Sequence, residues 1–407
     1  MASKKFPLSG FGSVAIHSGH TPDGNYAHLT PIYASSTYLF DNADQGMQRF
    51  KGEEKGYIYS RWGNPTMTEA EEKISALEGF GVAAENTEPI KLKTILHASG
   101  MAALSTLLLG TLKSGDKILT HFSLYGGSQE LMENILPGLG IEAIIIDLRD
   151  LNAAEAAIKK DTTIKMVYLE TPANPTIQCV DLEALTRLAK VHNLIVAVDN
   201  TFATPYLQQP FKYGVDYVFH STTKFLNGHG TAIGGALVGK DIEHMEHRIT
   251  KVHRLLGGNA NPFDAFLLVQ GMKTLEVRMD RHCSNALKVA TFLSNHVSVK
   301  KVNYLGLDSH PDHLTSLKQM KHPGAMLSFE LKGMQAAKDC IDNLQMCVRA
   351  VSLGTCDTLL SHPASMTHFG VPKEKREKYG ITDGLIRMSV GIENVEDILN
   401  DLDQALR

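Results

Sequence analysis

Seven short apolar segments alternate with helix-like patterns between residues 94 and 239, and this alternation restricts the fold more than any other feature. The segments are apolar throughout rather than at every second residue, as expected for strands buried on both faces. The patterns between them, such as "MAALSTLLLGTLK" and "DLEALTRLAKVH", are typical of helices. The sequence therefore predicts an α/β fold, in which a mostly parallel seven-stranded sheet carries helices on both faces. The predicted strands span residues 94–99, 117–121, 142–147, 164–170, 194–200, 216–220 and 234–239.

The pattern changes on both sides of this region. The first residues have mixed polarity and poor periodicity, which predicts an extended arm. The first long helix is expected to have Thr66 or Thr68 as its cap and to stop at Gly79. After residue 262, a long helical stretch leads into fewer and more alternating strands, such as 325–331. We therefore predict an arm (1–63), a large domain (64–262) and a smaller α+β C-terminal domain (263–407).

Composition and charge exclude several classes of function. The chain has 407 residues, 43% hydrophobic and 21% charged, as ordinary globular proteins do. Its net charge of -4, without a basic block or an acidic tail, argues against nucleic acid and anionic membranes as partners. The apolar stretches are too short to span a bilayer, and the first residues lack the apolar segment of a signal peptide. We expect a cytoplasmic protein.

The spacing of cysteine and histidine predicts no metal site. We expect reduced thiols at all five cysteines, Cys179, Cys283, Cys340, Cys347 and Cys356. Cys340 and Cys347 are seven residues apart and are expected on one face of a helix in the core. His244, His247 and His253 lack a cysteine or carboxylate in a matching pattern, which favours a solvated helix face over metal ligation.

Polar residues follow three of the predicted strands at their carboxyl ends. The run "VYLE" leads into "TPANP", "LIVAV" into "DNTF", and "DYVFH" into "STTK". In a doubly wound sheet, ligands bind where these strand ends open into a crevice. The candidate site residues are therefore Asn174, Asp199, Ser221, Thr223 and Lys224.

This set has the chemistry required to bind pyridoxal phosphate. Hydroxyl groups and the amides of a helix N-terminus bind phosphate, and Ser99, Gly100 and Met101 stand where a strand ends and a helix begins. A buried Asp199 requires a cationic partner, such as a protonated ring nitrogen. A desolvated Lys224 attacks an aldehyde as a free amine. Singly, Asp199 could be a helix cap, Lys224 a solvated charge and the hydroxyl run a turn, but together they indicate pyridoxal phosphate.

Longer motifs are distributed over nearly the whole chain. They are "YSRWGNPT", "SLYGGS", "ETPANPT", "VDNTFATPYLQQP", "HSTTKFLNGHG", "MKTLEVRM", "SLGTCDTLLSHPASMTH" and "GLIRMSVGIE". These motifs resemble those of the Cys/Met-metabolism family of pyridoxal-phosphate enzymes. The family includes cystathionine γ-synthase, cystathionine γ-lyase, methionine γ-lyase and the O-acylhomoserine sulfhydrylases. The resemblance implies a fold-type I architecture, with the cofactor bound by the domain of residues 64–262.

The resemblance also implies how each residue would act on the cofactor. Lys224 would bond to the cofactor aldehyde and then carry protons between substrate carbons. Asp199 would keep the ring nitrogen protonated, and Asn174 would contact the ring hydroxyl. Tyr125 would stack on the ring and help to protonate the leaving group. The phosphate would be bound by Ser99, Gly100, Met101, Ser221 and Thr223.

Further positions are implied for the substrate and for a second subunit. Arg387 would bind the substrate carboxylate with its planar guanidinium, and Ser352 would lie beside it. Asn174 and Tyr125 would also contact the substrate. Tyr59 and Arg61 would reach the phosphate of a neighbouring subunit, so that the arm becomes an oligomer contact. The resemblance suggests a homotetramer built from two active-site dimers.

Three positions bear on the reaction within the family. Cystathionine-handling members commonly have Glu before the serine of "SLG", where Val351 stands, and an acidic residue before "YSR", where Ile58 stands. Their replacement by apolar residues favours an apolar thioether such as methionine. Methionine γ-lyases typically carry Cys directly after "LYG", where Gly127 stands, and this leaves a broader γ-lyase or a sulfhydrylase open.

We therefore expect a carbon–sulfur γ-lyase, with methionine γ-lyase as the leading interpretation, acting on a small sulfur amino acid. The alternatives are a cystathionine γ-lyase, or γ-replacement by a cystathionine γ-synthase or an O-acylhomoserine sulfhydrylase. A non-catalytic nucleotide-binding module is disfavoured, because no G-x-G-x-x-G or G-K-[ST] follows the first strand. The segment 83–93 is longer than expected for the family, and we expect it to be a surface loop.

Overall fold

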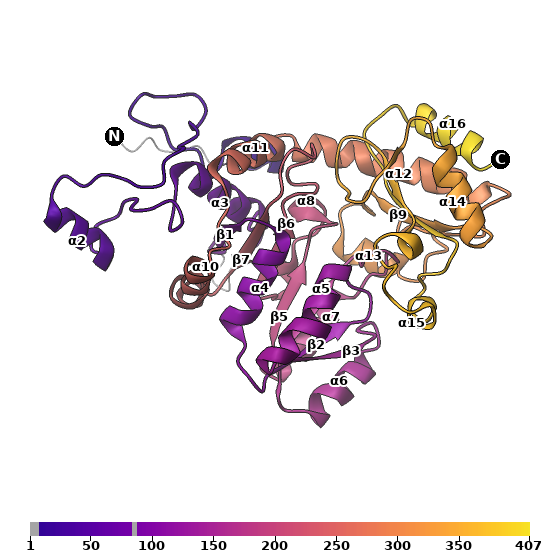
Figure 1. Cartoon of the computed structure of the whole chain (residues 1–407), viewed down its shortest axis with the longest axis horizontal. Coiled ribbons are helices and arrows are strands. Elements are labelled where there is room, and N and C mark those ends of the chain that lie inside the picture. Colours follow the sequence, from indigo (N-terminus) through magenta and orange to yellow (C-terminus); the bar gives the residue numbers. More distant parts are fainter. Residues whose placement is uncertain (1–7, 84–87) are drawn as a thin grey trace.

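The computed structural model describes residues 8–83 and 88–407. Figure 1 shows a central region built on one large sheet, a second region at the C-terminal end, and an N-terminal segment that extends away from both. Four residues of the predicted insertion, 84–87, lie outside the described residues. On either side of them, Ala83 and Pro89 form an isolated antiparallel bridge.

The large sheet has seven strands in the order β1-β7-β6-β5-β4-β2-β3. Their bounds are β1 (Lys93–His97), β2 (Lys117–His121), β3 (Glu142–Ile146), β4 (Ile164–Glu170), β5 (Ile195–Asp199), β6 (Tyr217–Ser221) and β7 (Gly235–Gly239). All neighbouring pairs are parallel except those of β7, which runs antiparallel to β1 and β6. The predicted mostly parallel seven-stranded sheet is confirmed.

Both faces of this sheet are covered, and alternate residues of each strand belong to different cores. In β4, Val167 packs into the core that contains the apolar face of α3 (Pro65–Glu78). Met166 and Tyr168 pack on the opposite face, against α4 (Gly100–Thr111). Each residue of the strand therefore meets an apolar environment, which explains why the segment is apolar throughout rather than alternating.

The other helices between the strands are short, and two of them are single turns. They are α5 (Gly126–Glu130), α6 (Leu151–Lys160), α7 (Leu182–Val191), α8 (Thr204–Leu207), α9 (Ile242–His244) and α10 (Thr250–Leu256). The predicted cap of α3 was wrong, because Asn64 precedes Pro65 and its Oδ1 accepts the Thr66 N–H at 3.0 Å. The helix ends at Glu78 and Gly79 follows as its C-cap, in agreement with the predicted stop at Gly79.

The C-terminal region is built on a five-stranded sheet in the order β10-β11-β12-β9-β8. The strands are β8 (Lys301–Asn303), β9 (Met326–Glu330), β10 (Val348–Arg349), β11 (Leu359–Ser361) and β12 (Leu385–Ser389). The helices are α11 (Pro262–Met272), α12 (Leu275–Asn295), α13 (His313–Gln319), α14 (Gly333–Asn343), α15 (Lys373–Lys378) and α16 (Val395–Ala405). This mixture is the predicted α+β arrangement, while the exact domain limits remain predictions.

Two expectations about cysteine and histidine need correction. All five cysteines are unpaired, but Cys340 and Cys347 do not share a helix, because α14 ends at Asn343. Both thiols are buried in the C-terminal core. His253 does not lie on a solvated face: it is buried with its ring 4.7 Å from that of His97, and burial lowers its pKa to about 4. Within residues 8–83 and 88–407, no cluster of three metal-ligating side chains occurs.

The N-terminal segment has two helices, α1 (Phe11–His17) and α2 (Ala43–Lys51), of which α2 lies farthest from the sheet in Figure 1. Helix α1 packs on α3 and α12, with Phe11 in the main core, so this part of the predicted arm contributes to the globular body. In the described part of the chain, no helix has both the length and the apolarity to cross a membrane.

Lys73 of α3 closes the C-terminal end of α1. Its buried Nζ donates hydrogen bonds to the carbonyl oxygens of Ala15, Ile16 and Ser18 at 2.8, 3.1 and 2.6 Å. Burial lowers the pKa of this ammonium to about 8. The last carbonyls of a helix lack partners within it, so a side-chain donor at this point fixes α1 against the core.

Replacing Lys73 by Ala should lower the free energy of unfolding by about 2 kcal/mol, because carbonyls of α1 would stay buried without a donor. The measurement is denaturant unfolding followed by circular dichroism. Lys159→Ala is the matched control. Within the part of the chain that the structure describes, its exposed ammonium pairs with Glu155 one turn away and with no other acid, so we expect a change below about 0.5 kcal/mol. Equal effects of the two substitutions would contradict this role of Lys73.

Candidate active site

A cavity of about 270 Å³ opens at the carboxyl edge of the large sheet. Ten of the predicted site residues line it: Ser99, Gly100, Met101, Tyr125, Asn174, Asp199, Ser221, Thr223, Lys224 and Arg387. The wall also contains residues that the sequence did not single out: Ser128, Glu170, Pro172, Thr201, Phe202, Phe219, Ile233 and Leu353. Ser352 contacts two of the lining residues.

The register of the parallel strands brings the strand ends together. Glu170 at the end of β4 lies opposite Asp199 at the end of β5, which in turn lies opposite Phe219 of β6. Side chains two residues apart share a face, so Glu170 points to the α4 side of the sheet, as Tyr168 does. The cavity therefore lies between the strand ends and the helices of that face.

The N-terminus of α4 forms one end of the cavity. Ser99 caps the helix, with its Oγ accepting the Ala102 N–H at 3.1 Å. The N–H groups of Gly100 and Met101 fall in the first turn, where no intrahelical carbonyl is available. A Cβ at Gly100 would lie 2.9 Å from the Cβ of Ser221, so only glycine lets this turn approach the end of β6. Amides and hydroxyls thus converge in the manner of an anion site.

Lys224 projects into the cavity from the turn after β6. Its Nζ donates to the Ser352 Oγ at 2.7 Å. Burial, together with the nearby charge of Arg387, lowers the pKa of this ammonium to about 8. A large fraction of the side chain is therefore a neutral amine near pH 8, which is the state that attacks a carbonyl.

Arg387 of β12 is a buried cation whose binding capacity is incompletely used. It is 5% exposed, and burial lowers its pKa to about 10. Nη1 donates to Asn174 Oδ1 at 3.2 Å and Nη2 to the Ser352 carbonyl at 2.6 Å. Among the described residues, its buried Nε has no partner. An uncompensated buried guanidinium is costly, and a bound carboxylate would supply both the charge and an acceptor.

Ser352 connects Lys224 with Arg387. Its φ of 91° lies in a region that residues other than glycine rarely adopt. In this conformation, its hydroxyl contacts the amine of Lys224 while its carbonyl accepts from Arg387. The unusual backbone at Ser352 thus places two cationic groups of the site.

Asp199 and Glu170 are two carboxyls on neighbouring strand ends. Burial raises the pKa of Asp199, although its Oδ1 accepts the Thr201 N–H at 2.9 Å. Burial and the charge of Asp199 raise the pKa of Glu170 well above its usual value. The sequence prediction missed Glu170, although the run "VYLE" ends a wholly apolar strand with this carboxyl, and that was the available signal.

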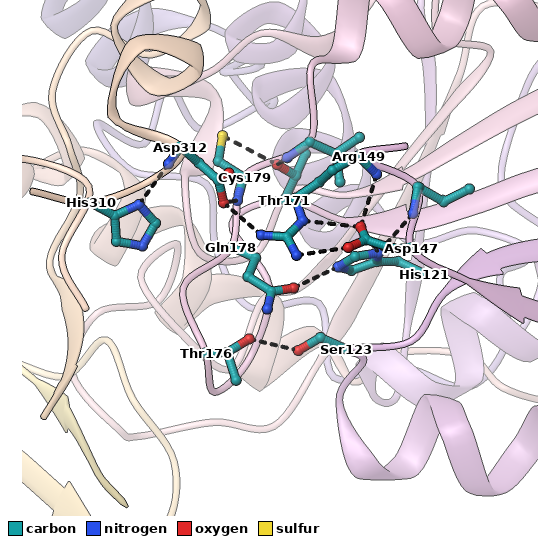
Figure 2. A network of polar contacts seen from close by, with 12 residues as sticks. His121, Ser123, Asp147, Arg149, Thr171, Thr176, Gln178, Cys179, His310 and Asp312 are labelled. Atoms are coloured by element: carbon teal, nitrogen blue, oxygen red, sulfur yellow. Dashed lines mark hydrogen bonds and ion pairs between the residues drawn. The ribbon is translucent and has the colours of Figure 1, made fainter. Parts of the chain in front are cut away.

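A network of polar side chains fixes the loop after β4, which carries Asn174 (Figure 2). Arg149 donates from Nε and Nη2 to the two carboxylate oxygens of Asp147 at 3.0 and 2.7 Å. Its Nη1 lies 3.4 Å from Asp312 Oδ2, and the same oxygen accepts the Cys179 N–H at 3.0 Å. The end of the loop is thus joined to the segment before α13.

His121 and Ser123 hold the middle of the same loop (Figure 2). His121 Nδ1 accepts the Leu148 N–H at 3.1 Å, and its Nε2 lies 2.9 Å from Gln178 Oε1. These partners require a neutral ring with its proton on Nε2, and burial lowers the pKa of His121 accordingly. Ser123 Oγ lies 3.0 Å from Thr176 Oγ1 and 3.3 Å from the Asn174 carbonyl oxygen.

Tyr59 and Arg61 do not belong to the cavity wall of their own chain. Tyr59 is 42% exposed, and the Arg61 guanidinium lies 5.6 Å from the centre of its ring. Arg61 also donates to the carbonyl oxygen of Arg254. These two residues are the ones that the sequence assigned to a neighbouring subunit.

The residues of the cavity fit pyridoxal phosphate. The first turn of α4 and the hydroxyls of Ser221 and Thr223 suit a phosphate. Asp199 offers a carboxyl in the cavity wall for a ring nitrogen, and Lys224 an amine for the aldehyde. The set of donors, acid and amine is therefore complete within one cavity.

The chain belongs to the family described as Cys/Met metabolism PLP-dependent enzyme, which its residues 12–407 match. It is a pyridoxal-phosphate-dependent enzyme, as the sequence predicted, and its relatives confirm the predicted lyase class. L-methionine gamma-lyase of Fusobacterium nucleatum subsp. polymorphum is 49% identical, over 100% of this chain and 99% of that protein.

Related enzymes with other names are also similar. Cystathionine beta-lyase of Coxiella burnetii is 41% identical over 96% of this chain and 96% of that protein. The crystal structure of cystathionine gamma synthase from Xanthomonas oryzae pv. oryzae has a TM-score of 0.90 and 36% identity, over 98% of each chain. The predicted fold class is confirmed by this likeness.

The lowered pKa of Lys224 gives a pH dependence for cofactor attachment to the apo-protein. The neutral amine gains population as pH rises through about 8, so the rate of attachment should rise from pH 6 and level off above this pKa. Stopped-flow absorbance after mixing apo-protein with pyridoxal phosphate measures this rate. Lys224→Ala should bind the cofactor without the absorbance change of covalent attachment. A rate in the wild type that is independent of pH between 6 and 9 would contradict the assigned pKa.

Proposed function

We propose that this enzyme is a γ-lyase for L-methionine and closely related thioether amino acids. Methionine and water would give methanethiol, 2-oxobutyrate and ammonia. The observation that carries this proposal is the buried Arg387, whose Nε has no partner among the described residues, facing Lys224 in a cavity with apolar walls. An α-carboxylate fits the guanidinium, and an apolar side chain fits the walls.

The chain's own groups would bind the substrate and move its protons. Pyridoxal phosphate, when bound, supplies an electron sink for the bonds at the substrate α-carbon. Arg387 and Asn174 would orient the substrate carboxylate. Lys224 Nζ would accept the α-proton and return protons to other carbons, because burial keeps a fraction of it neutral. Tyr125 Oη would donate a proton to the departing sulfur.

The charge inventory of the cavity supports a substrate without a charged distal end. Among the described lining residues, the cations are Lys224 and Arg387 and the carboxyls are Asp199 and Glu170. Lys224 and Asp199 are assigned to the cofactor, and Arg387 to the substrate α-carboxylate. Glu170 accepts a hydrogen bond from the protein backbone. Of the described residues, no further charged one lines the wall to bind the second amino-acid end of cystathionine, and Ile233 and Leu353 supply apolar surface instead.

Gly127 favours a somewhat wider range of thioethers. A Cβ at this position would lie 2.6 Å from Tyr125 Cε1 and 3.2 Å from Met101 Sδ. The Tyr125 ring therefore occupies space that the cysteine of typical methionine γ-lyases would need. This packing is the specific observation that keeps cystathionine γ-lyase activity as a second candidate.

We also propose a homotetramer built from active-site dimers, located in the cytoplasm. The N-terminal segment extends away from the sheets (Figure 1), with Leu39 91% exposed and with exposed aromatic rings at Tyr26 and Phe50. Large exposed apolar side chains on one segment favour contact with another copy. In such a dimer, Tyr59 and Arg61 would reach the phosphate of the neighbouring subunit.

The proposed activity predicts 2-oxobutyrate and methanethiol from L-methionine alone. Purified holoenzyme is assayed with L-methionine, with L-cystathionine, and with O-acetylhomoserine in the presence and absence of sulfide. We expect the highest kcat/KM with methionine, and loss of turnover in Lys224→Ala. Turnover restricted to O-acetylhomoserine plus sulfide would identify a sulfhydrylase instead.

A negative charge at position 351 should change the substrate preference. Val351 is 55% exposed and directly precedes Ser352, so Val351→Glu places a carboxylate beside the carboxylate-binding groups. We expect the ratio of kcat/KM for L-cystathionine to that for L-methionine to rise about tenfold, because the new acid can bind a distal ammonium. Val297→Glu, at an exposed site outside the cavity, serves as the control. An unchanged ratio in Val351→Glu would place specificity elsewhere.

A further inference from the structure

Glu170 is a buried carboxyl of the cavity wall for which the proposed reaction assigns no step. It is 4% exposed at the end of β4, and it lies opposite Asp199 in the parallel register. A glutamate at the edge of a covered sheet loses its hydration, so its place must be maintained by interactions within the protein. Its hydrogen bonds show what it stabilises.

The Glu170 carboxyl binds the backbone around two residues of the site. Its Oε1 accepts the Tyr125 N–H at 2.7 Å, at the point where α5 begins. Ser128 of α5 and the backbone of Asn174 also form hydrogen bonds with this carboxyl. Asn174 in turn contacts Arg387 through Oδ1. One side chain thus joins the start of α5 to the loop after β4.

The start of α5 depends on this contact. Among residues 8–83 and 88–407, no side-chain hydrogen bond caps the helix at Tyr125, and Gly126 and Gly127 follow, so the local sequence provides little stiffness. The direction of the Tyr125 ring is set by its backbone, and Glu170 is a buried acceptor for the N–H of that backbone. A shift of about 1 Å in a reacting group is sufficient to reduce a rate about 100-fold.

The charge of Glu170 is limited by its neighbours. The titratable groups that interact with it are Asp199 on β5 and Tyr168 on its own strand, and α5 and the loop after β4 contribute uncharged donors. Two adjacent carboxylates at a buried edge do not ionise together readily. Asp199 would have the cationic ring nitrogen of a bound cofactor as its partner, so the negative charge would belong on Asp199.

We propose that Glu170 is a positioning residue that acts as a neutral acid, with Oε1 accepting the Tyr125 N–H. It fixes Tyr125 and Asn174 in place and leaves the single negative charge of the pair to Asp199. The inference rests on the proposed function only for the part that Tyr125 plays in the reaction.

The test compares Glu170→Gln, Glu170→Asp and Glu170→Ala in the holoenzyme. Gln keeps the shape, the carbonyl acceptor and the neutral charge, so we expect kcat/KM within about threefold of the wild type. Ala removes the acceptor, and Asp withdraws it by one carbon. Both should lower kcat about 100-fold, with a smaller change in KM. Activity that is kept in Glu170→Gln and lost in Glu170→Asp would show that the position of the acceptor matters and that a negative charge does not.

A second measurement does not depend on the substrate. The absorbance of the bound cofactor is titrated with pH in the wild type and in Glu170→Gln. If Glu170 is neutral, the midpoint should be the same in both proteins. If Glu170 is an anion, removing its charge beside the ring should move the midpoint down by about one pH unit. Cofactor affinity, measured by titration of the apo-protein, should remain within about threefold in Glu170→Gln.

Three outcomes would overturn the inference. Loss of kcat in Glu170→Gln as large as in Glu170→Ala would mean that the charge is required. Full activity in Glu170→Ala would mean that Tyr125 does not depend on this contact. A lower absorbance midpoint in Glu170→Gln would show an ionised Glu170, even where methionine is not the substrate. The titration therefore distinguishes failure of this inference from failure of the proposed function.

Discussion

The in-register ends of β4, β5 and β6 are the constraint on which the site depends. Apolar cores cover both faces of the sheet, and the polar groups that suit a ligand gather where the strands leave these cores. Because the strands run parallel, their carboxyl ends lie at one edge, where Glu170 stands opposite Asp199 and Ser221 lies two residues beyond Phe219, the partner of Asp199. The polar residues of the site therefore lie at the strand ends, because the strands themselves pack into apolar cores.

Residues distant in sequence then complete this edge. Arg387 comes from β12 and Ser352 from the turn before β11, and both meet the loop after β4 through Asn174. The network of Arg149, Asp147 and Asp312 fixes that loop against the segment before α13. The carboxylate-binding groups are thus bonded to residues of both sheets. This fixes the distance between the groups assigned to the cofactor and those assigned to the substrate.

The sequence was sufficient for features encoded by local periodicity. The seven strands were predictable, because burial on both faces leaves a continuous apolar run such as residues 164–170. Lys224 and Asp199 were predictable as polar residues at strand ends. Family resemblance, rather than periodicity, supplied Arg387 and Ser352, which lie in a region with weaker strand patterns.

The features that sequence reasoning missed depend on partners far along the chain. The burial of His253 against His97 joins residues of α10 and β1, and Lys73 finds its acceptors in α1. Glu170 could be recognised as unusual, but its contact with the Tyr125 backbone requires three-dimensional placement. Asn64 was a missed local signal, since an Asn–Pro pair is a common start for a helix.

The strained turn at Ser352 has a consequence for how such an enzyme can evolve. A single residue holds the resting amine through its side chain and the guanidinium through its main chain. A substitution at this position would disturb the amine of Lys224 and the guanidinium of Arg387 together. Its exposed neighbour, Val351, holds neither of these groups, so a substitution there would leave both contacts in place. Two adjacent positions therefore differ in what a substitution would cost, since one supports the chemistry and the other only borders it.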